Sequence, residues 1–248
     1  MNLLIDKTIK RLQEFEPSEG YYLADSGGKD SSVLLHLAKQ ADVKFDAHYQ
    51  FTSVDPPPLV KFIKHYHSKT EIHKPEMTMF QLILKKGMLP LRQARFCCEI
   101  LKERGGTGRF VLTGIRWEES PQRHSRTMFE YCQNDRTKKF LHPLCDWSWT
   151  DIWTYIRKEH IPYCKLYEFP YNFKRIGCIG CTFASVKDRQ RQFQFFPKYK
   201  NAYITTIKRL IDRDAYANFP SPEHVFDWWI SRKSAAAYLN NTQLCLFT

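Results

Sequence analysis

The sequence SGGKDSS, at residues 26–32, lies between a short apolar run at residues 21–24 and an apolar-periodic segment at residues 33–38. This order predicts a strand, a glycine turn and the start of a helix. The glycines allow backbone N–H groups to converge because no Cβ is in the way, and the helix N-terminus adds partial positive charge. The stretch therefore predicts a phosphate-binding loop, in which Lys29 can neutralise a phosphate oxygen and Ser31 can donate a hydrogen bond or cap the helix.

The same stretch resembles the PP-loop of the ATP pyrophosphatases, a group that includes adenylating enzymes and phosphoadenylyl-sulfate (PAPS) reductases, and it lacks the spacing of a Walker A loop. The resemblance implies a Rossmann-like α/β domain with a central, mainly parallel sheet, and cleavage of ATP with Mg²⁺ between the α- and β-phosphates. A serine–glycine turn that only caps a helix is the simpler alternative. The positions that the resemblance assigns to the nucleotide are Ser26, Gly27, Gly28, Lys29, Asp30, Ser31, Ser32, Asp55 and Gly114.

Four cysteines come from two short segments, an adjacent pair followed about eighty residues later by a C-x-x-C pair. Adjacent cysteines pair poorly with each other, whereas four thiolates from two segments suit one metal centre, either an iron–sulfur cluster or zinc. The flanking sequences, CCEILK at 97–102 and RIGCIGCT at 175–182, resemble the pattern that binds a [4Fe–4S] cluster in adenylyl-sulfate reductases. The resemblance implies that the ligands are Cys97, Cys98, Cys178 and Cys181. Four structural cysteines, or a mixture of structural and redox-active ones, are the alternative.

The other cysteines lack partners at ligand spacing. Cys145 and Cys164 lie among aromatic residues and are predicted to be core thiols, as free cysteines often are. Cys132 has no predicted role. Cys245 is either a reactive thiol near the end of the chain or a residue without a role.

A third motif begins within a predicted buried strand at residues 111–116, which ends in glycine and arginine. The carboxyl edge of a parallel sheet is where ligands bind in open α/β folds. The residues G-I-R-x-x-E-S-x-x-R, from position 114, resemble a substrate motif of the PAPS reductase family. The resemblance implies that Arg116 and Lys29 stabilise charge on the α-phosphate, and that Arg116, Glu119 and Arg123 position the substrate. A solvated charged loop is the alternative.

Strand and helix patterns alternate as far as residue 185, and the remaining segment is predicted to be helical. We therefore expect a PP-loop domain at 1–185 and a helical extension at 186–248, with helices near 201–212 and 222–233. A further helix at 150–158 is expected to turn Trp149 and Trp153 inward. We expect no secretory signal, because the first residues are soon interrupted by charge, and no apolar run has membrane-spanning length. Under that expectation, eight cysteines indicate a reducing cytoplasm.

The formal net charge of +12 favours a polyanionic partner. Aromatic residues interleave one basic run, at Phe193, Phe195, Phe196 and Tyr199, where they either stack on bases or pack into a core. The first functional reading is an ATP pyrophosphatase with an iron–sulfur cluster that adenylates an oxygen of a nucleic acid, DNA rather than RNA, for sulfur insertion. This reading resembles DNA phosphorothioation proteins and transfer-RNA thiolases, and it implies a cysteine desulfurase and other sulfur-modification proteins as partners.

The second reading is a PAPS or adenylyl-sulfate reductase, which uses a nucleophilic cysteine to release sulfite. The intact loop and the altered surroundings of Cys245 depart from that family. The third reading is the small subunit of a sulfate adenylyltransferase, which has no need of the four cysteines. A cluster-bearing module that binds nucleic acid without catalysis is the non-enzymatic alternative.

Overall fold

The computed structural model describes residues 1–133 and 135–245, with side chains described as far as residue 240. It divides into two compact units, each assembled from three segments. The first unit comprises Met1–Phe51, Pro57–Lys74 and Arg104–Ile176, and the second comprises Thr52–Pro56, Pro75–Glu103 and Gly177–Thr248. The boundary expected between residues 185 and 186 lies inside the second unit.

The first unit contains a six-stranded sheet in the order β3-β2-β1-β4-β6-β5. Every pairing is parallel except that of β5 with β6, so the predicted mainly parallel α/β fold is confirmed. The strands are β1 (Tyr21–Ala24), β2 (Phe45–Gln50), β3 (Glu71–His73), β4 (Phe110–Leu112), β5 (Phe129–Tyr131) and β6 (Lys139–Leu141). The helices of this unit are α1 (Asn2–Glu14), α2 (Lys29–Gln40), α3 (Pro57–Tyr66), α6 (Pro121–His124), α7 (Trp149–Lys158) and the short η1 (Trp117–Glu119) and η2 (Lys165–Tyr167).

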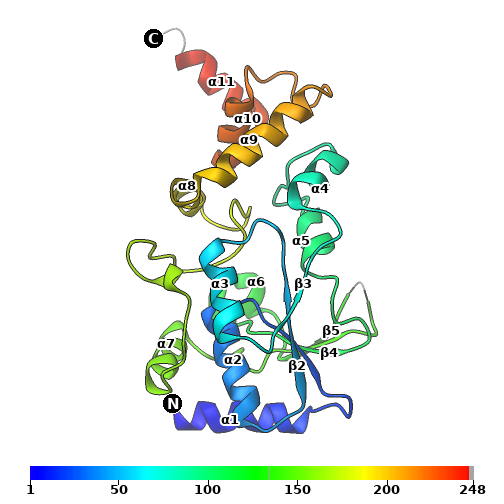
Figure 1. The fold of residues 1–248 in the computed structure, drawn as a ribbon, viewed down its shortest axis with the longest axis vertical. Coiled ribbons are helices and arrows are strands. Elements are labelled where there is room, and N and C mark those ends of the chain that lie inside the picture. Colours follow the sequence, from blue (N-terminus) through cyan, green and yellow to red (C-terminus); the bar gives the residue numbers. More distant parts are fainter. Residues whose placement is uncertain (134, 246–248) are drawn as a thin grey trace. The chain divides into compact units, whose positions relative to one another are not determined.

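One face of this sheet forms the main core with α1, α2 and α7. Because side chains alternate along a strand, Tyr21 and Leu23 of β1 share this face and are fully buried. They join apolar residues of the three helices in one cluster. Figure 1 shows two of these helices, α1 and α2, in blue beside the sheet. Trp149 was expected inward, but it is 49% exposed because it is the first residue of α7, beyond the part of the helix that the core covers.

The order in which strands are added to the sheet reverses at β1 and β4. These two strands are parallel neighbours in the sheet, although several elements separate them in sequence. Loops at such a switch point border the ligand crevice of open α/β sheets. The loop after β1 is the SGGKDSS segment, and the loop after β4 begins at Thr113. The strand predicted at 111–116 therefore ends early, at Leu112. A Cβ on Gly114 would lie 3.1 Å from the Cβ and carbonyl carbon of Asp30, so the close approach of the two loops favours glycine there.

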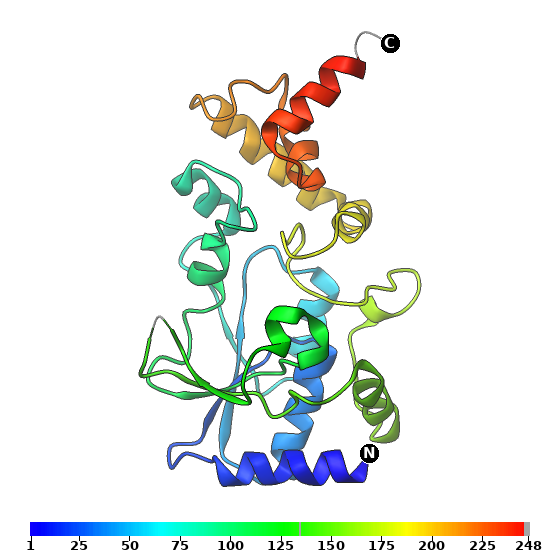
Figure 2. The same ribbon diagram turned by 180° about the vertical axis from the view of Figure 1, so that it is seen from behind.

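The second unit is helical. Its helices are α4 (Met79–Lys86), α5 (Phe96–Leu101), α8 (Val186–Phe195), α9 (Pro197–Ile211), α10 (Pro222–Ser231) and α11 (Ala235–Cys245), and Figure 2 shows the last four coloured from yellow to red. Ser185 caps α8, and proline begins both α9 and α10, as helix starts favour. The helices predicted near 201–212 and 222–233 are confirmed, although α9 begins earlier.

Three of the four interleaved aromatic residues, all but Phe195, pack inward in the second unit. Phe193 is buried in the core with Tyr203 and Trp229, and Phe196 and Tyr199 pack against the same cluster. The structure therefore supports the packing alternative over base stacking at these positions. Among the described residues, no helix combines the length and apolar character needed to cross a membrane.

Candidate nucleotide site and cysteine centre

The SGGKDSS segment forms a tight loop between β1 and α2. Gly27 has φ +65°, and a Cβ there would lie 2.6 Å from Ile63 Cγ1, so both backbone and packing require glycine. Gly28 is the N-cap of α2, and the Ser31 hydroxyl donates to its carbonyl oxygen at 3.0 Å. The first N–H groups of a helix have no partner within the helix, so this end of α2 presents backbone donors and the positive end of the dipole to a ligand. The predicted strand–turn–helix arrangement is confirmed.

A buried aspartate beneath the loop holds it in place. The backbone N–H of Gly27 donates to Asp25 Oδ1 at 2.8 Å, and Oδ2 lies 2.6 Å from His67 Nδ1 and 2.9 Å from the donating hydroxyl of Thr70. Burial would raise the pKa of Asp25, but the hydrogen bond and charge of His67, with those from Gly27 and Thr70, lower it overall. Asp25 thus serves as an ionised anchor. Asp25 directly follows β1, and this position is the one feature of the sequence that could have identified it as a site residue. Nothing in the sequence pointed to His67 or Thr70.

Lys29, Asp30 and Arg116 form a charged group at the N-terminus of α2. Lys29 Nζ lies 2.8 Å from Asp30 Oδ2, and Arg116 Nε lies 2.7 Å from Asp30 Oδ1. Lys29 and Arg116 are 4% and 3% exposed, so both cations are buried beside the loop. Burial would lower the pKa of Arg116, but Asp30 and the neighbouring glutamates raise it, which keeps the guanidinium charged. The structure therefore brings together two residues that the sequence assigned to the α-phosphate.

Arg116 is also held by the loop that follows it. Its Nη1 donates to Glu118 Oε2 at 2.9 Å and to the carbonyl oxygen of Trp147 at 3.2 Å. Glu119 accepts from the backbone N–H of Arg116 at 3.1 Å and forms an ion pair with Arg123. The predicted substrate-positioning residues are thus neighbours in one ordered loop, which argues against a freely solvated one. Burial, with the charge of Arg175 adding to it, lowers the pKa of Arg123 despite Glu119.

Tyr167 was not found by sequence analysis. Its hydroxyl accepts the backbone N–H of Lys29 at 3.0 Å, so a phenol occupies one of the donors that a phosphate would use. The ring also lies 5.9 Å from Lys29 Nζ. Burial raises the pKa of Tyr167 well above its ordinary value, so the hydroxyl stays neutral. The contact joins residues 138 positions apart, and no local pattern predicts it.

The four predicted cysteine ligands all lie in the second unit and line a single cavity. Cys97 and Cys98 belong to α5, while Cys178 and Cys181 lie in the loop before α8. The cavity has a volume of about 40 Å³, a few times the roughly 10–15 Å³ that one water molecule needs. Its other lining residues are Thr52, Met79, Pro90, Lys102, Ile179, Gly180, Thr182 and Tyr203. The predicted gathering of two distant cysteine pairs is present.

The sulfurs in this cavity have distinct electrostatic surroundings. The thiol of Cys97 donates to Cys98, which lowers the pKa of Cys98; burial opposes this shift and Lys102 adds to it. Burial raises the pKa of Cys178, against the charge of Lys102 and the hydroxyl of Thr52, whose Oγ1 lies 3.3 Å from Cys178 Sγ. All four cysteines are free thiols. Among the described side chains, no three of these sulfurs lie within 4.8 Å of one another.

The other residues that the sequence singled out lie in different parts of the fold. Asp55 belongs to the second unit, where its carboxylate accepts from the backbone N–H and hydroxyl of Thr52, at 2.6 and 2.8 Å. Asp55 is therefore linked to the cysteine cavity through Thr52, and its role as a nucleotide ligand stays a prediction. Cys145 and Cys164 are both buried in the first unit, as expected of core thiols. The side chain of Cys245 lies outside the described residues.

Comparisons with known proteins agree with this architecture. The family description "Phosphoadenosine phosphosulfate reductase domain" matches residues 20–184. An adenosine 5'-phosphosulfate reductase of Oceanobacillus iheyensis is 32% identical over 177 residues, covering 64% of this chain and 70% of that protein. An uncharacterized protein of Methanocaldococcus jannaschii is 27% identical over 212 residues and covers 81% of this chain. The aligned region is 51% of that protein, so the chain spans about half the length of this relative.

The fold is also similar to that of a solved phosphoadenylyl-sulfate reductase from Candida auris, in a phosphate complex. The TM-score is 0.55 at 19% sequence identity, and the match covers 73% of this chain and 95% of that one. The family match extends over more than half of the chain and includes the loop, the Gly114–Arg123 motif and all four cavity cysteines. The chain therefore belongs to the phosphoadenosine phosphosulfate reductase domain family.

Proposed function

We propose that this chain is a sulfonucleotide reductase that acts on adenylyl sulfate or its 3'-phosphorylated form. The observation that carries the proposal is the gathering of Cys97, Cys98, Cys178 and Cys181 around one cavity. The second support is the similarity to adenosine 5'-phosphosulfate reductases at 32% identity. These findings favour the reductase over the nucleic-acid reading that the charge and the intact loop suggested first.

In this proposal the first unit binds the nucleotide. Backbone N–H groups at the start of α2 and the ammonium of Lys29 hold the phosphate, while Asp30 fixes the orientation of Lys29 and Arg116. The Arg123 guanidinium, held in an ion pair with Glu119, is offered to an anionic group of the nucleotide. Each of these cations has a carboxylate partner, so the site is charge-balanced before the nucleotide binds.

The four cavity cysteines are the proposed ligands of a [4Fe–4S] cluster. A single zinc ion with Zn–S bonds of about 2.3 Å would hold its sulfurs about 3.8 Å apart. These sulfurs form no group of three within 4.8 Å, and the wider arrangement suits a larger centre. Lys102 supplies a positive charge next to the thiolates, and Thr52 a hydrogen-bonding hydroxyl. When bound, the cluster would supply a charged, redox-active centre whose potential depends on such neighbours.

The proposed reaction is a thiol-dependent reduction. A cysteine thiolate attacks the sulfur of the nucleotide sulfate, the S–O bond to the phosphate breaks, and the nucleotide leaves with the bonding electron pair. A second thiol then attacks the cysteine sulfur, which forms a disulfide and releases sulfite, so two thiols supply the two electrons. Two cysteines, Cys132 and Cys245, are assigned to neither the cluster nor the core. Cys245 is the proposed nucleophile, because it is the one of the two that the sequence offers as a reactive thiol.

The test is release of sulfite and AMP from adenylyl sulfate by anaerobically purified protein with a dithiol. We expect both products in equal amounts, and loss of both in Cys245→Ser with unchanged iron content. Cys132→Ser is the matched control, because Cys132 lies outside the cavity. Absence of sulfite with either sulfonucleotide, from protein that holds iron, would overturn the proposal.

A second candidate is favoured by the buried Lys29–Asp30–Arg116 group together with the net charge of +12. In that case the protein cleaves ATP with Mg²⁺ and adenylates an oxygen of a nucleic acid, and a cysteine desulfurase provides sulfur. The test is pyrophosphate release from ATP, with and without DNA or RNA. Release that a nucleic acid stimulates, without any sulfite from adenylyl sulfate, would select this candidate over the reductase.

A further inference from the structure

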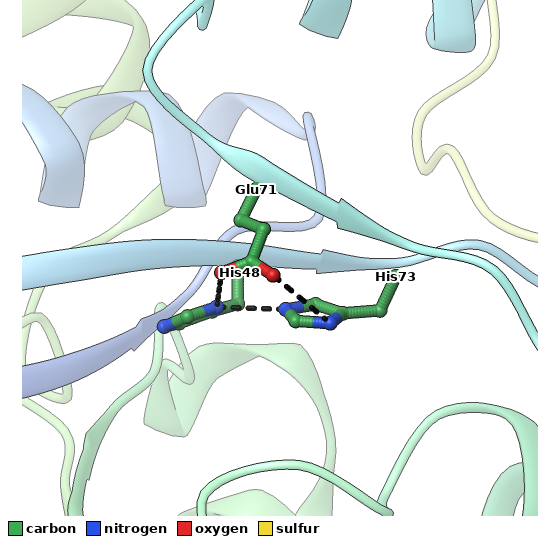
Figure 3. A group of neighbouring side chains, drawn as sticks. All are labelled: His48, Glu71 and His73. Carbon is green, nitrogen blue, oxygen red and sulfur yellow. Dashed lines mark hydrogen bonds and ion pairs between the residues drawn. The ribbon is translucent and has the colours of Figure 1, made fainter.

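Two histidines and a glutamate meet on the edge of the sheet in the first unit, apart from the residues of the nucleotide loop. The parallel register of β2 and β3 pairs His48 with Glu71 and Gln50 with His73. Side chains two positions apart share a face, so His48, Glu71 and His73 project from the same side of the sheet. Figure 3 shows the Glu71 carboxylate directed at both imidazole rings.

The ligand atoms of this group are close together. His48 Nδ1 lies 2.8 Å from His73 Nε2, and the two Glu71 oxygens lie 3.5 Å from His48 Nδ1 and 3.7 Å from His73 Nδ1. One ligand atom from each residue fits within 4.8 Å of the others, and this is the one such trio among the described residues. A tetrahedral metal ion with metal–nitrogen bonds of about 2.0–2.1 Å separates two nitrogens by about 3.3 Å, so a small opening of the rings admits an ion.

Asp46 determines which nitrogen of His48 faces this group. The Asp46 carboxylate forms a hydrogen bond with His48 Nε2, and its other oxygen accepts from Arg109 Nη2 at 2.6 Å. A carboxylate only accepts, so this contact favours a proton on Nε2 and leaves Nδ1 as the nitrogen that faces His73. A carboxylate that binds the outer nitrogen of a histidine is the usual support for a metal-ligating imidazole, because it fixes the tautomer and raises the basicity of the ligand.

The surroundings hold the His48 ring still while they leave the group open to solvent. The ring of Tyr22 stacks on His48 with centroids 4.0 Å apart and planes at 8°. The backbone of His73 is tied to Arg104 Nη2, which donates to its carbonyl oxygen at 3.1 Å. His48 is 9% exposed, whereas the Glu71 side chain is 66% exposed. A buried ligand beside an exposed one leaves space for water in the remaining coordination positions.

We propose that His48, Glu71 and His73 bind a divalent transition-metal ion with the preferences of Zn²⁺, completed by water. Two imidazoles and one carboxylate are ligands that zinc favours, and such a set also admits Cu²⁺ and Ni²⁺ but disfavours Mg²⁺ and Ca²⁺. The ion would bridge β2 and the edge strand β3. This site is independent of the proposed reaction and of the cysteine cavity.

The experiment is equilibrium dialysis of the full chain, stripped with a chelator, against Zn²⁺. His73→Gln should lose one zinc per chain relative to the wild type, whereas His65→Gln, an exposed histidine on α3, should lose none. Zinc held by cysteines is the same in both variants, so the difference reports the histidine group. Glu71→Gln, at an exposed position where folding is not at risk, should bind about tenfold more weakly, and Asp46→Asn about 10–100-fold.

A second readout excludes an indirect effect. In ¹⁵N spectra of the imidazoles, added Zn²⁺ should shift the signals of His48 and His73 and leave those of His65 in place. Equal zinc content in His73→Gln and the wild type would overturn the proposal. It would also be overturned if zinc bound while the His48 and His73 signals stayed unchanged.

Discussion

Arg116 Nε lies 2.7 Å from Asp30 Oδ1, so an ion pair between a buried guanidinium and a partly exposed carboxylate ties the loop after β4 to the first turn of α2. The second oxygen of Asp30 holds Lys29 at 2.8 Å. Asp30 therefore fixes two cations beside the backbone donors of the loop, and an incoming phosphate shares cations that are already oriented. Such orientation before binding is what makes charged side chains effective in stabilising developing negative charge.

Replacing Lys29 tests the loop directly. Lys29→Ala should reduce nucleotide turnover by about 100-fold or more, because it removes a buried ammonium beside the backbone donors at the start of α2. Iron content should stay unchanged, since Lys29 belongs to the first unit and the cysteines to the second. Lys39→Ala, at an exposed position in the last turn of the same helix, is the control and should keep full activity. Turnover of Lys29→Ala at the wild-type rate would remove the loop lysine from catalysis.

Replacing one cavity cysteine tests the cluster. Cys178→Ser should lose most of the iron and the associated visible absorbance, because a hydroxyl is a poor substitute for a thiolate ligand. Iron per chain after anaerobic purification is the measurement, and Cys132→Ser should match the wild type. If Cys178→Ser retained full iron content, the ligand assignment would be wrong for that residue.

The local part of this site could be predicted from sequence. The strand, turn and helix around SGGKDSS depend on neighbouring residues, and the glycines were expected where backbone groups converge without a Cβ. Gly27 meets that expectation in a left-handed conformation, at φ +65°. The two cysteine pairs also line one cavity, as the prediction of a single metal centre requires, and the cysteines with described side chains are free thiols.

The parts that sequence analysis missed depend on contacts between distant residues. The Asp25–His67 pair spans 42 positions and the Lys29–Tyr167 contact spans 138, so neither leaves a local pattern. The His48–Glu71 alignment depends on the register of two parallel strands, which composition does not set. Trp149 was predicted inward from its aromatic character, but its place at the start of α7 leaves it half exposed.

Tyr167 competes with a ligand for the N–H of Lys29. Tyr167→Phe removes the acceptor and leaves this donor unpaired in the free protein, which should lower the free energy of unfolding by about 1–3 kcal/mol. A bound phosphate would satisfy the freed donor, so ATP or phosphate should raise the Tm of the variant more than that of the wild type. Tyr163→Phe is the matched control, because the hydroxyl that it removes donates to Glu168 at 2.9 Å on the surface. A smaller ligand-induced shift in Tyr167→Phe would show that the hydroxyl assists binding.

The lowered pKa of Asp25 predicts a specific loss of stability in acid. A carboxyl whose pKa is lower in the folded than in the unfolded state stabilises the fold fully above its unfolded value, about 3.9, and loses that contribution as the pH falls through the folded value. Asp25→Asn should cost about 2–4 kcal/mol at pH 7, because Gly27, His67 and Thr70 lose an ionised acceptor. Urea denaturation should show this difference from the wild type shrinking below pH 4. Asp6→Asn, at an exposed position on α1, controls for loss of one negative charge, and a difference that stayed constant from pH 7 to pH 3 would mean that Asp25 is not an ionised anchor.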